Sequence, residues 1–321
     1  MSNEDVVTTE SVTEELISEQ ETNLDSIDNT QEYLKLVEEL LAQQQIDFTE
    51  DQQKFASCSK DAAYWSDVRN KLLQEVNSSV LETEKIFKEY SITYDKFPPE
   101  IQQVLNGSDN GLKIIQRMIG RLLEQSAPLS ELSVLEDLPL LPDQIELLLS
   151  VEKEQDRETV EKKLGKLLKD LGNQRWDVLS NGTNTVNSYR KEFIRFIEKR
   201  VLNIVDGIES GENNSLSLIA SLKDTYIDQA ENLTIWFSTY SILKDLLIQM
   251  LAKVHVFRME VEIGTPIDYE KHEPFDVEVD ESLKNEDIKE LTRSGYEYIP
   301  DQSTRSVLRH AQVVVVKNLE S

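Results

Sequence analysis

Apolar residues recur every three or four positions along much of the chain, the spacing that places side chains on one face of a helix. The longest run in the first half extends from about residue 60 to residue 90. Shorter runs predict a helix at 101–105, which the turn signal Asn106-Gly107 ends, and another helix at 112–123. Residues 31–142 are therefore predicted to form a small helical module.

The same period returns between residues 143 and 256, which predicts a long helix followed by a helical bundle. Gly172-Asn173 and Asn181-Gly182 are turn or helix-end signals, so a break is predicted between residues 172 and 184. The polar run at 210–214 predicts a loop. Aromatic residues at helical spacing in this region are typical of a core or of a seam between two copies.

The pattern changes to a period of two near the C-terminus, as expected for strands with one buried face. Residues 258–263 and 275–280 alternate apolar and polar side chains, and Val313–Val316 is the strongest strand signal in the chain. Residues 257–318 are therefore predicted to form a compact, mostly antiparallel β domain. The predicted fold class is α+β, mainly α-helical, with this small C-terminal β domain.

Residues 1–30 differ from the rest of the chain in composition. They contain nine acidic residues and neither a basic nor an aromatic one. A segment with high charge and few apolar residues cannot bury enough surface to offset the entropy lost on ordering. This segment is predicted to be a disordered acidic tail.

The chain as a whole is strongly acidic, with 61 acidic and 34 basic residues and a formal charge of −27. This charge argues against nucleic acid or an anionic membrane surface as a partner, because phosphate binding requires clustered Lys and Arg. The sequence contains no run of about 20 apolar residues, so no membrane span is predicted. The N-terminus lacks the pattern of a signal peptide, so a cytoplasmic location is expected.

Residues that could carry catalysis or bind a metal are few. The three histidines, His255, His272 and His310, lack metal-site spacing, and Cys58 is the single cysteine. The HExxH, GxSxG and glycine-rich phosphate motifs are absent. We therefore expect a protein that is not an enzyme and that uses neither a cofactor nor a metal.

Three short motifs near the C-terminus follow one another in a specific order. The residues that carry them are Gly264, Pro266, Asp268, His272 and Glu273, then Leu291, Gly295 and Tyr296, then Leu308, Arg309, Ala311, Val313 and Val315. This arrangement resembles the GrpE family, whose members carry G-x-P-x-D-P-x-x-H-(E/Q)-A, then L-x-K-G-Y, then L-R-x-A-x-V-x-V. Residues 200–209 resemble the family segment in which the dimerising helix leads into a short helical bundle. The resemblance covers about residues 185–318.

The resemblance implies a co-chaperone that works as an adenyl-nucleotide exchange factor during protein folding. It implies binding to the nucleotide-binding domain of a DnaK-type chaperone, with the β domain acting as a wedge that promotes ADP release. It also implies a homodimer, since the family's paired helices hold two copies together.

Partner contact is predicted at seven positions of the β domain: Pro266, Asp268, His272, Tyr296, Arg305, Arg309 and Val315. Alternatives remain open for several of them. Asp268 and His272 could instead fix the loop after Gly264, and Tyr296 could belong to the core. Val313 and Val315 share one face of their strand and Val314 and Val316 the other. One pair is expected to pack inward, and the other could form an exposed apolar contact patch.

A second hypothesis also fits the sequence. The chain could be a non-catalytic helical adaptor that carries a GrpE-like β domain and binds another protein through its N-terminal helices. The extra helical module and the departure at His310, where the family often has proline, favour this alternative.

Overall fold

The computed structural model describes residues 48–129, 132, 136–139 and 157–318, together with Lys35 and Glu39. The acidic tail predicted at 1–30 lies outside the described residues. These contain long helices and a small C-terminal β region, which confirms the α+β prediction. The chain divides into two compact units, one made of residues 1–61 and 133–185 and the other of residues 62–132 and 186–321. The domain boundaries drawn from the sequence stay a prediction.

The helices are α2 (Phe48–Tyr94), α3 (Pro99–Gly120), α4 (Leu122–Ser126), α6 (Arg157–Phe196), α7 (Leu202–Lys223) and α8 (Ala230–Lys253). A π-helical turn, η1 (Ile197–Val201), joins α6 to α7, and a 3₁₀ turn, η2 (Ile227–Gln229), precedes α8. None of the helices in the described ranges is long and apolar enough to cross a membrane.

The break predicted between residues 172 and 184 is wrong, because α6 runs through it as one helix. Apolar side chains are buried on both sides of this stretch, Leu168 and Leu171 before it and Val186 and Tyr189 after it. A glycine inside a helix costs about 1 kcal/mol relative to alanine. Burying one leucine contributes about 1.5–3 kcal/mol, so the packed stripe outweighs the two turn signals.

Two further turn predictions fail for a similar reason. The helices predicted at 101–105 and 112–123 are largely one helix, α3, whose apolar face continues across Asn106-Gly107. The loop predicted at 210–214 lies inside α7. A Cβ on Gly211 would lie 2.4 Å from Cε1 of Tyr240, so glycine serves here to let α7 and α8 approach closely.

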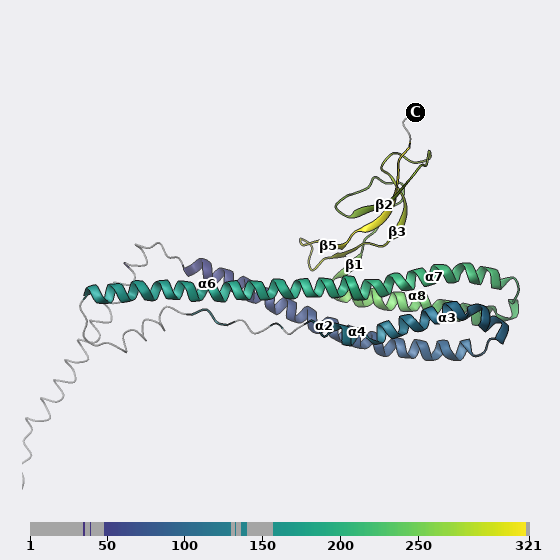
Figure 1. Ribbon diagram of the computed structural model, residues 1–321, viewed down its shortest axis with the longest axis horizontal. Helices are drawn as coiled ribbons and strands as arrows, with labels where there is room; N and C mark the ends of the chain where they lie inside the picture. The colour runs from purple at the N-terminus through teal and green to yellow at the C-terminus, as the bar shows by residue number, and fades with distance from the viewer. Residues whose placement is uncertain are drawn as a thin grey trace, which may run out of the picture. The chain divides into compact units, whose positions relative to one another are not determined.

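Helices α3, α7, α8 and the second half of α2 pack together in the second unit, and they lie side by side in Figure 1. Their buried apolar side chains form the core of a helical bundle. From α2 and α3 these include Leu72, Val76, Ile101, Leu105 and Leu112, and from α7 and α8 they include Ile208, Trp236, Tyr240, Leu243 and Leu247.

The C-terminal residues form two three-stranded sheets. Their strands are β1 (Val256–Arg258), β2 (His272–Glu278), β3 (Ile288–Arg293), β4 (Tyr296–Tyr298), β5 (Ser306–Arg309) and β6 (Ala311–Val316). One sheet has the order β1-β4-β5 and the other β2-β6-β3. Only the β2–β6 pair is parallel among these strands, as expected for a mostly antiparallel domain.

Aromatic side chains join the first sheet to the helices of the same unit. The ring of Tyr298 in β4 stacks on Trp65 of α2, with centroids 5.7 Å apart and planes at 19°. Phe193 of α6 meets the same tyrosine edge-on at 6.1 Å. Such pairs contribute about 0.5–1.5 kcal/mol beyond their buried area, so the sheet has a packed base on the helices.

The contact between Gly211 and Tyr240 gives a test of the bundle. Gly211→Ala should lower the free energy of unfolding by about 1–3 kcal/mol, the usual range for overpacking. The tyrosine cannot easily move aside, because it is buried and its hydroxyl bonds the carbonyl oxygen of Ser108 at 3.0 Å. Urea denaturation measures the change.

Gly207→Ala, on the same helix, is the matched control. No atom lies within 4 Å of a Cβ built on Gly207, so alanine should gain up to about 1 kcal/mol from its helix propensity. Equal effects of the two substitutions would contradict the close contact.

Candidate functional site

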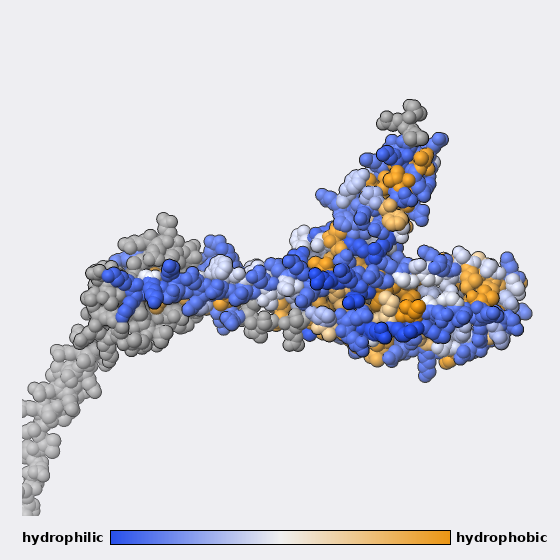
Figure 2. Space-filling model, viewed as in Figure 1, coloured by the Kyte–Doolittle hydropathy of each residue, from blue (hydrophilic) through white to orange (hydrophobic). Residues whose placement is uncertain are grey.

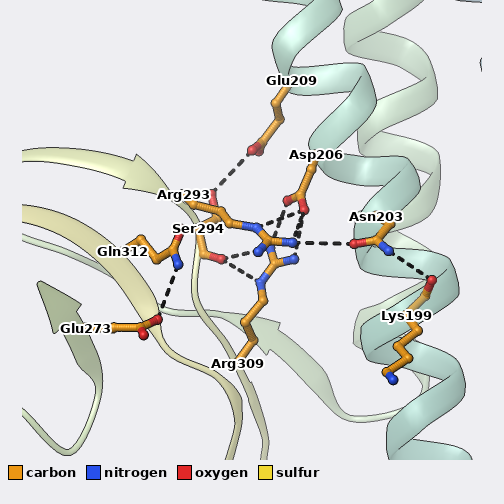
Figure 3. A network of polar contacts seen from close by, with 9 residues as sticks. All are labelled: Lys199, Asn203, Asp206, Glu209, Glu273, Arg293, Ser294, Arg309 and Gln312. Carbon is orange, nitrogen blue, oxygen red and sulfur yellow. Dashed lines mark hydrogen bonds and ion pairs between the residues drawn. The ribbon is translucent and has the colours of Figure 1, made fainter. Parts of the chain in front are cut away.

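One carboxylate, that of Asp206 near the start of α7, binds two arginines of the β domain. Arg309 donates from Nη1 to Oδ2 at 2.9 Å and from Nη2 to Oδ1 at 2.8 Å. Arg293 donates from Nε and Nη2 to Oδ2 at 3.0 and 2.7 Å. Figure 3 shows both guanidinium groups converging on this carboxylate. Since Arg293 belongs to β3 and Arg309 to β5, a single helix residue holds both sheets.

Arg309 has further partners inside the fold. Its Nε and Nη2 donate to the carbonyl oxygen of Ser294 at 3.2 and 2.8 Å. Its guanidinium lies 5.2 Å from the ring centre of Tyr296, where the aromatic face attracts a cation. Only 9% of the side chain is exposed. The arginine therefore has little surface left for another protein and is suited to positioning the β domain.

Gly295 allows the chain to reach this arrangement. A Cβ there would lie 2.5 Å from the backbone nitrogen of Ala311 and 2.8 Å from Sδ of Met259. Only glycine fits so close to another strand. The Gly295-Tyr296 motif thus has a packing reason, since it places the Ser294 carbonyl and the Tyr296 ring against Arg309.

Two of the predicted contact residues, Tyr296 and Val315, lie in the interior. Burial raises the pKa of Tyr296 to about 12. Val315 packs in a small core with Ile267, Ile288 and Val313. Val314 and Val316, on the other face of β6, are buried as well, so the exposed valine patch considered from the sequence is absent from this strand.

The loop after Gly264 is fixed by its own polar residues. Gly264 has a φ of 82°, a conformation that favours glycine. Asp268 accepts a hydrogen bond from the backbone nitrogen of Glu270 at 3.0 Å, the main cause of the lowered pKa of its carboxyl group, and pairs with Lys271 at 3.2 Å. Pro266 lies exposed on the same loop.

His272 closes this loop from inside. Its Nδ1 accepts a hydrogen bond from the backbone nitrogen of Asp268 at 3.2 Å, and its own backbone nitrogen donates to the Asp268 carbonyl at 2.7 Å. Burial lowers the pKa of the imidazole, against the opposing effect of the Asp268 charge. The structure therefore brings Asp268 and His272 together as loop-fixing residues.

Arg305 is the accessible arginine of the predicted set. Its side chain is 57% exposed, and its Nε lies 3.1 Å from Oε2 of the largely buried Glu297. It lies apart from the Asp206 cluster, in the turn before β5. Together with Pro266 and Asp268 it remains available for contact with another molecule.

The surface of the β domain carries exposed apolar side chains that were not among the predicted contact residues (Figure 2). Phe275, Val277 and Val279, on and just after β2, each expose more than half of their surface. Alternation over 275–280 predicts an apolar face turned to the core. In the structure β2 is an edge strand of its sheet. The three exposed side chains therefore lie outside the small core to which Val315 belongs.

Sequence reasoning also did not select Asp206 and Arg293. Asp206 lies in the 200–209 segment of the family resemblance, which was the available signal. Its partners are 87 and 103 residues away along the chain, and no sequence spacing predicts such pairs.

A polar cleft of about 300 Å³ lies beside the cluster, between helix and strands of the same unit. Its lining carries side chains of both charges, with Lys199, Arg293 and Arg309 on the basic side and Glu198 and Glu273 on the acidic side. Within the ranges described, no three His, Cys, Asp or Glu side chains are grouped as a metal site.

Comparison with known protein families gives one match for this chain. The sequence model of the GrpE family matches residues 141–317, more than half of the chain. The match includes α6, the bundle helices α7 and α8 and every strand of the β domain, and it begins well before residue 185, where the motif resemblance starts. No curated protein matches the chain.

Members of this family are co-chaperones of the nucleotide exchange type and are not catalytic enzymes. The matched region contains Asp206 and both of its arginine partners, so the cluster that holds the β domain lies within it. The chain therefore belongs to the GrpE family.

Proposed function

We propose that this protein binds the nucleotide-binding domain of a DnaK-type chaperone in the cytoplasm and promotes release of ADP during protein folding. The proposal rests on the family match. That match covers the β domain and the helix residue Asp206, whose carboxylate holds the domain. An exchange factor makes and breaks no covalent bond. It needs a surface that prefers the nucleotide-free chaperone, and it shifts the equilibrium only by that difference in affinity.

The attachment of the β domain supports a wedge role. A wedge transmits its binding energy to the partner only if it does not bend at its own base. The bidentate pair between Arg309 and Asp206 fixes direction as well as distance. The stacked rings of Trp65 in α2 and Tyr298 in β4 form a second contact between the β domain and the helices.

We assign two roles to the residues predicted to meet the partner. Pro266, Asp268 and Arg305 are accessible, and we propose that they contact the chaperone. The exposed apolar side chains of Phe275 and Val277 extend the same proposal to β2. Apolar side chains in the centre of an interface commonly carry much of its binding energy.

The other four residues, His272, Tyr296, Arg309 and Val315, are proposed to hold the β domain in shape rather than to meet the chaperone directly. Each is largely enclosed by other parts of the fold. The adaptor hypothesis receives less support, since α3 packs against α7 in the bundle and so has a structural task.

The first test is ADP release. Added protein should accelerate the loss of a fluorescent ADP analogue from the cognate chaperone in stopped flow, with a rate that saturates as the complex fills. By thermodynamic reciprocity, ADP should weaken the affinity between the two proteins by the same factor. No acceleration at saturating protein would reject the exchange function.

The β2 surface gives a second test. The double substitution Phe275→Ser and Val277→Ser should weaken chaperone binding at least tenfold, about 1.4 kcal/mol, and leave the melting temperature close to wild type because both side chains are exposed. Isothermal titration and thermal melting measure the two quantities. Ile242→Ser, on a 47% exposed isoleucine of α8, is the control and should bind normally. Unchanged affinity of the double variant would remove β2 from the interface.

A third test concerns the attachment of the β domain. Asp206→Ala should cost about 3 kcal/mol of unfolding free energy, because it leaves two arginines facing each other without their carboxylate. It should also slow ADP release, since the β domain loses a fixed point. Arg309→Lys keeps the charge but loses the bidentate geometry, so an intermediate effect is expected.

Urea denaturation and stopped flow measure both effects. Arg200→Ala, on an exposed arginine of η1, should change stability by less than about 0.5 kcal/mol. Wild-type stability and exchange in the Asp206 variant would show that the cluster does not hold the domain.

A further inference from the structure

A short covalent link joins the β domain to the helices. Helix α8 ends at Lys253 and β1 begins at Val256, so only Val254 and His255 connect the two. His255 has a φ of 62°, in the left-handed region that residues with a side chain seldom adopt. All six strands follow this link in the sequence. Contacts across space, and not a second crossing of the chain, must therefore set the direction of the domain.

Helix α2 supplies one set of these contacts, separate from Asp206 and within the second unit. The ring of Trp65 is 6% exposed and stacks on Tyr298 of β4 at 5.7 Å. The same ring meets Phe193 of α6 at 5.3 Å. The hydroxyl of Tyr64, the preceding residue, bonds the hydroxyl of Tyr298. Two adjacent residues of α2 thus hold Tyr298 by its ring and by its hydroxyl.

Tyr298 occupies a central position in its sheet. It lies in β4, the middle strand of the order β1-β4-β5. In β1 its partner is Val256, the first residue after the link. In β5 its partner is Ser306, which directly follows the accessible Arg305. Holding Tyr298 therefore places both the strand that leaves the link and the strand that begins beside Arg305.

Helix α2 also reaches the helical side of the link. Glu75 of α2 pairs at 2.8 Å with Lys253, the last residue of α8. Because Lys253 is 61% exposed, this pair contributes little energy, but it shows that α2 passes the end of α8. Between Trp65 and Glu75, Val68 and Leu72 are buried. A packed stretch of α2 therefore spans the joint between helix and sheet.

These contacts come from a segment outside the family match. The match covers residues 141–317, which include Asp206 and its two arginines but no part of α2. The β domain therefore has one attachment within the matched region and a second one supplied by the chain before it.

We infer that Tyr64 and Trp65 are positioning residues that brace the β domain and act on a chaperone only through its direction. Without them the domain keeps its own core and the Asp206 cluster, but takes a wider range of directions about the link at 254–255. The effect on exchange rests on the proposed function. The direction of the domain does not, so the two can be tested separately.

A distance measurement tests the brace. Spin labels are placed on Asn213→Cys in α7 and Glu281→Cys in the β domain, both exposed, with Cys58→Ser to remove the native thiol. Labelled protein is diluted with unlabelled protein, so that distances within one chain are measured by pulsed electron resonance. The wild type should give one narrow distribution. Trp65→Leu should broaden it, whereas Trp65→Phe keeps a ring against Tyr298 and should leave it narrow.

Phe87→Leu is the matched control, because Phe87 is 4% exposed on the same helix, about six turns beyond Trp65. It should leave the distribution narrow. Tyr64→Ala is a second broadening variant that spares the core, since Tyr64 is only partly buried. An unchanged distribution in both Trp65→Leu and Tyr64→Ala would overturn the inference. Equal broadening by Phe87→Leu would do so too, since it would reflect a general loosening of α2.

ADP release from the chaperone tests the consequence for exchange. In Trp65→Leu the protein concentration that gives half-maximal acceleration should rise about threefold or more, because binding must then also order the domain. Trp65→Phe and Phe87→Leu should stay close to wild type. A broadened distance distribution with unchanged exchange would show that the brace does not act on the chaperone. A wild-type protein that fails to accelerate release would reject the proposed function and leave the distance result standing.

Discussion

The carboxylate of Asp206 joins both sheets of the β domain to the helices. Asp206 receives four hydrogen bonds from two arginines, and these arginines come from different sheets. A helix residue can direct a domain in this way because bidentate pairing restricts angle as well as distance. The burial of Tyr296 beneath Arg309 and the close approach at Gly295 both follow from bringing the strands to this point.

Local sequence patterns predicted the main elements of the fold. The period of three to four residues indicated the long helices, and Val313–Val316 indicated a strand, because both patterns report burial directly. The failures lie at Gly172, Asn106-Gly107 and Gly211, where the local sequence predicts a turn and the helix continues. Whether a glycine ends a helix or lets a neighbour approach depends on what lies opposite, and that is a property of the tertiary structure.

The site was predicted less completely than the fold. The motifs include Arg309, Tyr296 and His272, but the neighbours of these residues in the fold decide what they do. The role of Asp206 depends on the closeness of α7 to β3 and β5 in space, which the sequence does not show. The exposure of Phe275 and Val277 follows from the edge position of β2, and strand order cannot be inferred from alternation along one strand.

The packing of one helical hairpin, α2–α3, against another, α7–α8, has a consequence for how the bundle can change. In a symmetric pair every substitution appears twice, at equivalent places on the two copies. Within a single polypeptide, a substitution at Tyr240 or Ser108 appears once, and its neighbour can change independently. The two hairpins of this bundle are therefore free to diverge, one of them leading into the β domain and the other packing on its helices.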